Sequence, residues 1–239
     1  MVNKKFSGEK VRDESLKRCM QKNLKPDELL KKGAEMLGLS LKQNQIDLFM
    51  IYLTEIKKWN RTYNLTGLKT DSDIVIKHFL DSLSFLIVLP LKTRVKVIDI
   101  GTGAGFPGIP LKIYLPAIEL ILVDSTLKKI LFLKHILRCL SLQNVAVLHE
   151  RAERLSLLYP NTFDIVISRA LFKTSKLISI AIPLLKKDGI IAISRGIKEP
   201  IEDLTTEIKE SGGVIKNIKE ITLPFSEYRR RLLLIQYLP

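Results

Sequence analysis

Cysteine is scarce in this chain: only two of its 239 residues are cysteines, Cys19 and Cys139. Each stands alone, without a CxxC pair or the spacing of a metal-ligand set. The sequence therefore excludes a disulfide framework and predicts no metal site.

Long apolar runs are also missing. The longest, Leu83–Leu91, contains Ser84 and Pro90 and is too short to span a bilayer. The first thirty residues are rich in Lys, Arg, Asp and Glu, which is not the pattern of a secretory signal peptide. We therefore expect a cytoplasmic protein with no membrane contact.

Acidic residues are outnumbered, because 39 Lys and Arg face 25 Asp and Glu and leave a net charge of +14. This balance favours a polyanionic partner such as nucleic acid, although a basic proteome background would give the same charge. The hydrophobic content of 46% is enough for a sizeable core. We expect the chain to fold alone and act as a monomer.

The first third of the chain has no strand pattern. Residues 1–25 are charged and aperiodic, which predicts a mobile basic arm or a frayed helix. Residues 26–92, which we call the helical appendage, carry helical periodicity. The helices predicted there cover about 26–37, 41–59 and 72–87, and Asn60 and Asn64 lead the chain out of the second one.

Between residues 93 and 239, short β-branched runs alternate with helical ones, as in a parallel sheet with right-handed crossovers. The predicted strands are 95–100, 119–123, 145–148, 164–168, 190–194, 215–223 and 232–237. The predicted helices are 109–114, 127–140, 171–185 and 200–211. No helix separates the last two strands, so the last one returns antiparallel. The predicted class is α/β, a Rossmann-like class I methyltransferase domain with a seven-stranded, mostly parallel sheet behind the appendage.

The stretch VKVIDIGTGAGFPGIPL at 95–111 carries the clearest sign of a binding site. Its apolar run reaches Asp99 and then breaks into glycines, at Gly101, Gly103, Gly105 and Gly108. A strand that ends in such a loop lets a ligand approach the backbone at the carboxyl edge of the sheet. We predict that a small polar cofactor binds there.

Two cofactors compete for this loop. The spacing of Gly103, Gly105 and Gly108 also fits the dinucleotide pattern GxGxxG, which alone is a weak signal. However, Pro107 and Pro110 remove amide donors where a pyrophosphate would need them. S-adenosylmethionine has no phosphate and carries an ammonium and a sulfonium, which suit the acidic Asp99. The context therefore favours the methyl donor over NAD.

The next two strand ends supply further polar residues. Asp124 can accept both hydroxyls of a ribose, or it can cap the following helix, a role open to Ser125 as well. After the third strand, Ala152 and Glu153 can frame an adenine, with Glu153 accepting from its amino group. The alternative for Glu153 is a surface pair with Arg151 or Arg154.

The fourth strand ends in Ser168, Arg169 and Ala170, where a transferred methyl group would be received. The chain has no Asn-Pro-Pro-aromatic loop and no cysteine near a strand end, so exocyclic-nitrogen and pyrimidine-C5 methylation lack their usual groups. Guanine N7 has an available lone pair and needs only positioning and charge. No catalytic residue is certain, and Arg169 is a positioning candidate or else a surface salt bridge.

For several other residues the sequence allows two interpretations. His78 and Asp81 form a surface pair or contact the substrate. Candidates for phosphate contacts are Lys128, Lys129, Arg195 and Arg229–Arg231. Trp59 is more consistent with a helix-end anchor than with a base-stacking platform.

Together these segments resemble the bacterial small-subunit ribosomal RNA guanine-N7 methyltransferases, the family also called glucose-inhibited division protein B. The matching segments are WNRTYNLT at 59–66, HFLDSL at 78–83, DIGTGAGFPGIPL at 99–111, VDSTLKKILFL at 123–133, RAE at 151–153 and SRA at 168–170. The resemblance covers about 41–238 and leaves out the N-terminal arm.

The resemblance implies S-adenosylmethionine as the donor and a guanine in the decoding-region loop of 16S ribosomal RNA as the acceptor, in naked RNA or in a small-subunit particle. The donor site it implies comprises Gly101, Phe106, Asp124, Ser125, Thr126, Ala152, Glu153 and Arg169, beside Asp99, Gly103 and Gly105 of the loop. Two other classes stay open: an RNA-binding module with an inactive cofactor pocket, and an NAD-dependent oxidoreductase.

Overall fold

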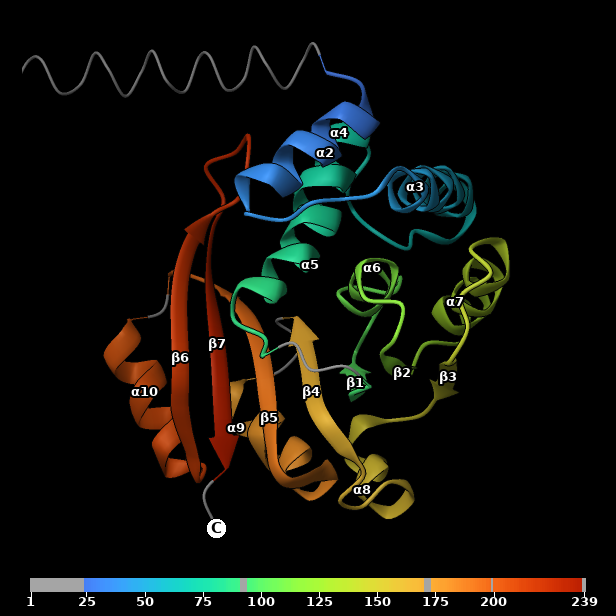
Figure 1. The fold of residues 1–239 in the computed structure, drawn as a ribbon. Coiled ribbons are helices and arrows are strands. Elements are labelled where there is room, and N and C mark those ends of the chain that lie inside the picture. The colour runs from blue at the N-terminus through green and yellow to red at the C-terminus, as the bar shows by residue number, and fades with distance from the viewer. Residues whose placement is uncertain (1–23, 91–93, 170–172, 199, 238–239) are drawn as a thin grey trace, which may run out of the picture.

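The computed structural model describes residues 24–90, 94–169, 173–198 and 200–237, so the predicted arm lies outside the described residues up to position 23. Seven strands form one sheet in the order β3-β2-β1-β4-β5-β7-β6. The first five strands of the chain pair in parallel, and β7 is antiparallel to both of its neighbours (Figure 1). The predicted fold class is confirmed.

The strands are β1 (Lys96–Ile100), β2 (Glu119–Asp124), β3 (Val145–His149), β4 (Phe163–Arg169), β5 (Leu185–Gly196), β6 (Gly213–Thr222) and β7 (Arg229–Tyr237). The helical segments between them are α6 (Gly108–Tyr114), α7 (Leu127–Cys139), η3 (Ala152–Arg154), α8 (Leu155–Leu158), α9 (Thr174–Ala181), η4 (Ile182–Leu184) and α10 (Ile201–Glu210). The appendage contains α2 (Pro26–Met36), α3 (Gln43–Tyr63), α4 (Asp71–Ile74), η1 (Val75–Leu80), α5 (Asp81–Leu83) and η2 (Ser84–Ile87).

Helices cover both faces of the sheet, as the alternation of side chains requires. In β1, Val97 belongs to the core beneath α2, α3, α6 and α7, whereas the next residue, Ile98, belongs to the core beneath α8, α9 and α10 (Figure 1). The first core is continuous from Leu29 and Phe49 of the appendage to Leu234 of β7. The appendage is therefore packed directly on the sheet.

The strand order places the candidate site. β1 lies between β2 and β4, so the direction in which strands are added reverses between β1 and β4. In open parallel sheets, ligands bind outside the carboxyl ends of the strands at such a switch point. The glycine loop after β1 and Arg169 at the end of β4 both lie there.

Two appendage predictions were wrong in detail. Helix α3 does not leave at Asn60 but continues to Tyr63 and ends at Asn64, whose φ of 47° is left-handed. The predicted single helix over 72–87 starts at Asp71, after the capping residue Thr70, and includes a π-helical turn at Val75–Leu80 and a 3₁₀ turn at Ser84–Ile87. Periodicity alone does not signal such changes of helix type.

Strand ends also differ from the sequence predictions. β5 begins at Leu185, five residues before its predicted start, and the helix predicted over 171–185 corresponds to α9 and η4, which end at Leu184; positions 171 and 172 lie outside the described residues. β7 begins at Arg229 instead of position 232, because cross-strand pairing with β6 extends to Thr222. The short helices after β3 were not predicted. Among the described residues, no helix is long and apolar enough to cross a bilayer.

Candidate functional site

The glycine loop after β1 turns through left-handed backbone. Gly101, Gly103 and Gly105 have φ values of 72°, 63° and 100°. A Cβ atom at Gly103 would meet nothing within 4 Å, so only its backbone conformation calls for glycine there. At Gly105, a Cβ atom would lie 2.6 Å from the hydroxyl of Tyr52. That hydroxyl donates a hydrogen bond to the carbonyl of Ala104, so helix α3 holds the loop directly.

Asp99, at the end of β1, lies beneath the loop and is completely buried. Its Oδ2 accepts from the Thr102 hydroxyl at 2.7 Å and from the Gly108 amide at 2.8 Å. Within the described part of the chain, Oδ1 has no hydrogen-bond partner. Burial raises the pKa of Asp99 to about 7, against the effect of these two hydrogen bonds. Asp99 thus ties the two ends of the loop together.

Asp124, at the end of β2, is also nearly buried, with 5% of its surface exposed. Its Oδ1 accepts from the Thr126 amide at 2.9 Å, and its Oδ2 accepts from the Gly103 amide at 3.0 Å and from Lys129 Nζ at 3.2 Å. The amide of Thr126, not Ser125, is the group that Asp124 meets at the start of α7. The carboxylate therefore joins the glycine loop to the start of that helix.

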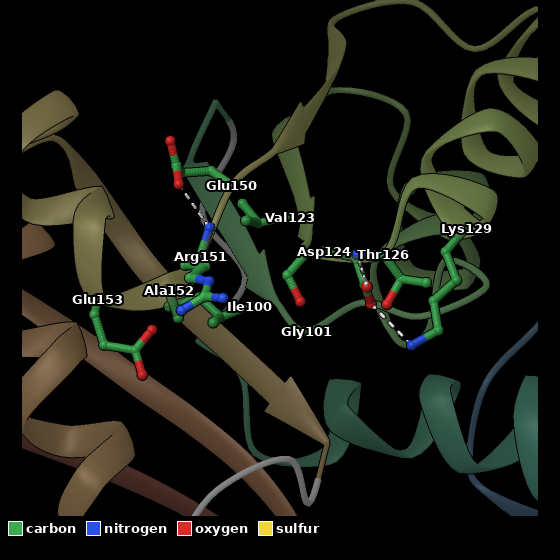
Figure 2. Close-up of a pocket in the computed structure, with 11 residues that line it drawn as sticks. Ile100, Gly101, Val123, Asp124, Thr126, Lys129, Glu150, Arg151, Ala152 and Glu153 are labelled. Carbon is green, nitrogen blue, oxygen red and sulfur yellow. Dashed lines mark hydrogen bonds and ion pairs between the residues drawn. The ribbon is translucent and has the colours of Figure 1, made fainter.

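A cavity of about 450 Å³ opens beside Asp124 at the carboxyl ends of β1, β2 and β3. We call it the donor pocket. Its lining consists of Ile100, Gly101, Val123, Asp124, Ser125, Thr126, Lys129, Glu150, Arg151, Ala152 and Glu153. Figure 2 shows Asp124, Thr126 and Lys129 on one side and the segment from Glu150 to Glu153 on the other. Six predicted residues are thereby brought into one cavity: Gly101, Asp124, Ser125, Thr126, Ala152 and Glu153.

Some features of the donor pocket were not predicted from the sequence. Glu150, at the end of β3, lines the pocket and accepts from the Arg151 amide at 2.8 Å. Glu153 pairs with neither of the predicted arginines: its carboxylate lies 2.7 Å from Lys176 Nζ, and that hydrogen bond lowers its pKa. Lys129, expected to contact phosphate, is bound to Asp124 instead. The strand-end rule that found Asp124 on β2 leads to His149 on β3, its partner in the sheet, and Glu150 is the next residue.

A second cavity, of about 330 Å³, lies where the appendage meets the ends of β4 and β5. We call it the basic notch, and its lining consists of Leu68, Lys77, His78, Asp81, Arg169, Ser194, Arg195, Gly196 and Arg230. Four cationic side chains face one carboxylate. Ser194 is a buried residue, with 1% of its surface exposed. Its hydroxyl group has no hydrogen-bond partner among the described residues. The notch suits an anionic, hydrogen-bonding ligand.

Asp81 is the buried anchor of this notch. The predicted surface pair of Asp81 with His78 is therefore wrong. Only 1% of Asp81 is exposed, and its two oxygens lie 3.4 Å from Arg169 Nη1 and 3.0 Å from Arg230 Nε. Arg169 also donates to the Lys77 carbonyl at 3.0 Å. The reading of Arg169 as a surface salt bridge is wrong, because 20% of its side chain is exposed and its partners lie on the appendage.

His78 is held as a neutral imidazole. Arg169 Nη2 can only donate and lies 2.9 Å from His78 Nδ1, so Nδ1 accepts and Nε2 carries the proton toward the Thr66 hydroxyl at 2.7 Å. Burial, with the nearby charge of Arg169, lowers the pKa of His78 to about 3. Both ring nitrogens are committed to hydrogen bonds, which leaves His78 without a lone pair for a substrate proton.

Phe106 joins the loop to the notch. It is 4% exposed, and its ring stacks on His78 at 4.4 Å and on Tyr52 at 5.4 Å between ring centroids. The Arg169 guanidinium lies 5.3 Å from the same ring. The contacts of Phe106 therefore connect the side chains of the notch to the backbone of the glycine loop.

The other residues predicted to contact phosphate have different surroundings in the structure. Arg229 and Arg231 both pair with Glu220, and Arg231 is 5% exposed, so it does not offer a phosphate contact. Lys128 is exposed on α7, whereas Arg195 and Arg230 line the notch. Trp59 packs on Phe132 and His135 of α7, which confirms its role as an anchor of helix α3.

The fold places the protein in a class. A solved structure described as a SAM dependent methyltransferase from Aquifex aeolicus matches 72% of this chain and 96% of its own, with a TM-score of 0.57 at 19% identity. A precorrin-6y C5,15-methyltransferase from Geobacter metallireducens matches 66% of this chain and 87% of its own, with a TM-score of 0.54 at 14% identity. The fold is that of the Rossmann-like methyltransferases.

Sequence comparison narrows this class to one family. A family model described as rRNA small subunit methyltransferase G matches residues 45–232, and the chain belongs to that family. A relative of that name from Thermoanaerobacter sp. (strain X514) is 38% identical over 213 residues, covering 87% of this chain and 89% of its own. Another from Geobacter sp. (strain M21) is 39% identical over 210 residues, covering 87% and 96%. The membership confirms the resemblance, the methyltransferase class and its cofactor, S-adenosylmethionine, over the oxidoreductase alternative.

Proposed function

We propose that this protein transfers a methyl group from S-adenosylmethionine to N7 of a guanine in the decoding-region loop of 16S ribosomal RNA. The observation that carries the proposal is the placement of two cavities at the same edge of the sheet, a donor pocket after β1–β3 and a basic notch, lined by Arg169, after β4 and β5. The relatives' shared name, ribosomal RNA small subunit methyltransferase G, supports the substrate class.

The donor pocket fits the cofactor by its chemistry. Its lining contains three carboxylates, of Asp124, Glu150 and Glu153, against two cationic groups, and one of those cations is already bound to Asp124. That set suits a ribose and a cationic donor better than a pyrophosphate. We assign ribose binding to Asp124, adenine framing to Ala152 and Glu153, and close backbone approach to Gly101, Gly103 and Gly105.

Five other predicted residues act around this pocket. Asp99 and Phe106 hold the glycine loop from beneath, as their burial and contacts support. Ser125 and Thr126 form the turn that Asp124 fixes. Arg169 lines the notch, with its guanidinium 5.3 Å from the Phe106 ring, and positions the acceptor.

The reaction requires the protein to align the methyl donor with the acceptor base, but not to remove a proton from the base. S-adenosylmethionine supplies the methyl group on a sulfonium centre, and guanine N7 already has an available lone pair. Two titratable side chains of the notch fit this demand, because His78 is committed at both ring nitrogens and Asp81 is committed to two arginines. Positioning and electrostatic stabilisation are then the protein's contribution.

The acceptor side is formed by the appendage together with the domain from residue 93 onward. Lys77 and His78 come from the appendage, Arg169 and Arg195 from β4 and β5, and Arg230 from β7. We assign the notch to the phosphate backbone and the acceptor base of the RNA. We further propose that the protein acts as a monomer in the cytoplasm, on the RNA or on a small-subunit particle.

Single-turnover transfer of labelled methyl from S-adenosylmethionine to ribosomal RNA tests the reaction. Because N7 needs no deprotonation, we expect the rate to vary only weakly between about pH 6 and 9. A rate that rises tenfold per pH unit would identify an acceptor that must lose a proton and would exclude guanine N7. Absence of transfer with intact cofactor binding would favour an RNA-binding module with an inactive pocket.

A further inference from the structure

Helices α3 and α7 lie side by side on the same face of the sheet and bring three metal-binding side chains together (Figure 1). His135 and Cys139 are four residues apart on α7 and therefore share one side of that helix. Glu55 reaches them from α3. This cluster was not predicted from the sequence, because Glu55 lies 80 residues before His135 in the chain.

The donor atoms are close enough for one ion to bind all three. His135 Nε2 lies 2.5 Å from Glu55 Oε2 and 3.4 Å from Cys139 Sγ, and one ligand atom from each residue lies within 4.8 Å of the others. Tetrahedral zinc, with its usual bond lengths, holds such donor atoms about 3.3 to 3.6 Å apart. Rotamer adjustments of about 1 Å, on a partly exposed surface, convert the observed positions of the three donor atoms into those of a tetrahedral zinc site.

We propose that Glu55, His135 and Cys139 form a zinc site that ties helix α3 to helix α7, with water as the fourth ligand. Carboxylate, imidazole and thiolate are the three ligand types that Zn²⁺ takes in proteins. A sulfur ligand excludes Mg²⁺ and Ca²⁺, which bind oxygen. The two negative ligands balance the charge of the ion.

The surroundings hold the ligands in place. The His135 ring packs on Trp59 with 5.1 Å between centroids, and the same indole meets Phe132 at 5.6 Å. The side chains of Glu55 and His135 are 16% and 25% exposed, whereas Cys139 is open to solvent. Lys58 Nζ lies 3.9 Å from the other oxygen of Glu55 and leaves Oε2 for the ion. The site is thus apolar on one side and accessible on the other, as ion entry requires.

The position of the site gives it a structural consequence. Glu55 lies on the same helix as Tyr52, whose ring stacks on Phe106 and whose hydroxyl binds the glycine loop. Tyr52 also stacks on Phe132 of α7. A zinc ion between α3 and α7 would clamp the two helices that flank this aromatic stack. Binding requires the Cys139 thiol to release its proton to solvent, so affinity rises with pH.

Metal titration of the full-length protein tests the proposal, in a Cys19→Ser background so that Cys139 is the sole thiol. We expect one Zn²⁺ per chain by calorimetry. Co²⁺ in its place should give the visible absorption of a tetrahedral site together with a thiolate-to-metal charge-transfer band. Saturating Zn²⁺ should also slow the reaction of Cys139 with a thiol reagent at least tenfold and raise the melting temperature.

Three further variants separate this site from unspecific binding. Cys139→Ser, His135→Gln and Glu55→Gln should each weaken Zn²⁺ at least tenfold, and Cys139→Ser should abolish the charge-transfer band. Asp47→Asn changes an exposed carboxylate on the same helix α3 and should leave Zn²⁺ affinity unchanged. Melting temperatures without metal show that each variant is folded. Equal Zn²⁺ affinity in the parent and in folded Cys139→Ser, or a cobalt spectrum without a sulfur band, would overturn the proposal.

Discussion

The donor pocket and the basic notch both lie at the carboxyl ends of the parallel strands, yet they are constructed in opposite ways. The donor pocket is formed by three consecutive strand ends and by the turns that directly follow them. The notch takes its residues from the loop before α4 and from η1, α5, β4, β5 and β7, with Asp81 and Arg230 separated by 149 positions. One site is local in sequence and depends on backbone conformation, whereas the other is assembled by the tertiary fold.

The two sites also differ in charge. In the donor pocket, backbone amides of Gly103 and Thr126 and the ammonium of Lys129 satisfy the carboxylate of Asp124. In the notch, two guanidinium groups satisfy the carboxylate of Asp81, and further cations remain around it. Substitutions in the first site should therefore act on cofactor affinity, and those in the second on methyl transfer. The following experiments test this division.

Gly103→Val should have the largest effect on cofactor affinity, at least a hundredfold, because a β-branched residue is strained at a φ of 63° and its side chain fills the approach to the loop. Calorimetry with S-adenosylhomocysteine measures the loss. Gly38→Val is the matched control: its φ is 77°, and a Cβ atom there also meets nothing within 4 Å. If both variants bind cofactor normally, the glycine loop is not the donor site.

Arg169→Ala should lower the single-turnover rate about thirtyfold to a thousandfold, which corresponds to about 2 to 4 kcal/mol at the transition state. It should also lower the free energy of unfolding by about 1 to 3 kcal/mol, because the buried Asp81 loses one of its two cations. Arg229→Ala removes a half-exposed arginine paired with Glu220 and should change neither quantity. An unchanged rate in folded Arg169→Ala would remove the notch from the reaction.

Asp124→Ala should weaken S-adenosylhomocysteine at least tenfold, since charge-assisted hydrogen bonds to a ribose are worth about 1.5 to 3 kcal/mol. The lost bonds to the Gly103 and Thr126 amides add to this effect by releasing the loop. Calorimetry gives the dissociation constant, and the RNA-binding affinity of the same variant serves as the internal control. Cofactor affinity equal to that of the wild type would place the ribose elsewhere.

His78→Gln should change the pH dependence of stability, with little effect at neutral pH on cofactor affinity. The folded protein keeps His78 neutral down to a pKa of about 3, whereas the unfolded chain protonates it below 6.5, so its contribution is present above pH 6.5 and is lost as the pH falls. The deficit of His78→Gln relative to wild type should therefore shrink between pH 6.5 and 4, by up to about 1.4 kcal/mol per pH unit.

Urea unfolding at several pH values measures this difference. Asp99 acts in the opposite direction, because its raised pKa of about 7 makes its contribution present at low pH and lost as the pH rises. It is common to both proteins, so it cancels in the comparison. A deficit that stays constant with pH would show that His78 is not held neutral by the notch.

The contrast between the sites also explains what the sequence could predict. Asp99 and Asp124 lie in the last two residues of their strands and the glycines follow β1, so the strand pattern located them at the sheet edge, and the alternation of strands and helices predicted the sheet. Burial of Asp81 and the contacts of Arg169 depend on the appendage packing against β4, which no local pattern specifies. The extension of α3 to Tyr63 was missed for a similar reason, because Trp59 packs on α7 and holds the last turn.

Mapping of modified guanines in 16S ribosomal RNA by mass spectrometry tests the central claim most directly. RNA from a strain that lacks this protein should be missing one N7-methylguanine in the decoding-region loop. Expression of the wild-type chain should restore it, and expression of the Gly103→Val variant should not. An unchanged set of modified guanines in the deletion strain, or loss of a methyl group at a different atom or in a different RNA, would contradict the proposed function.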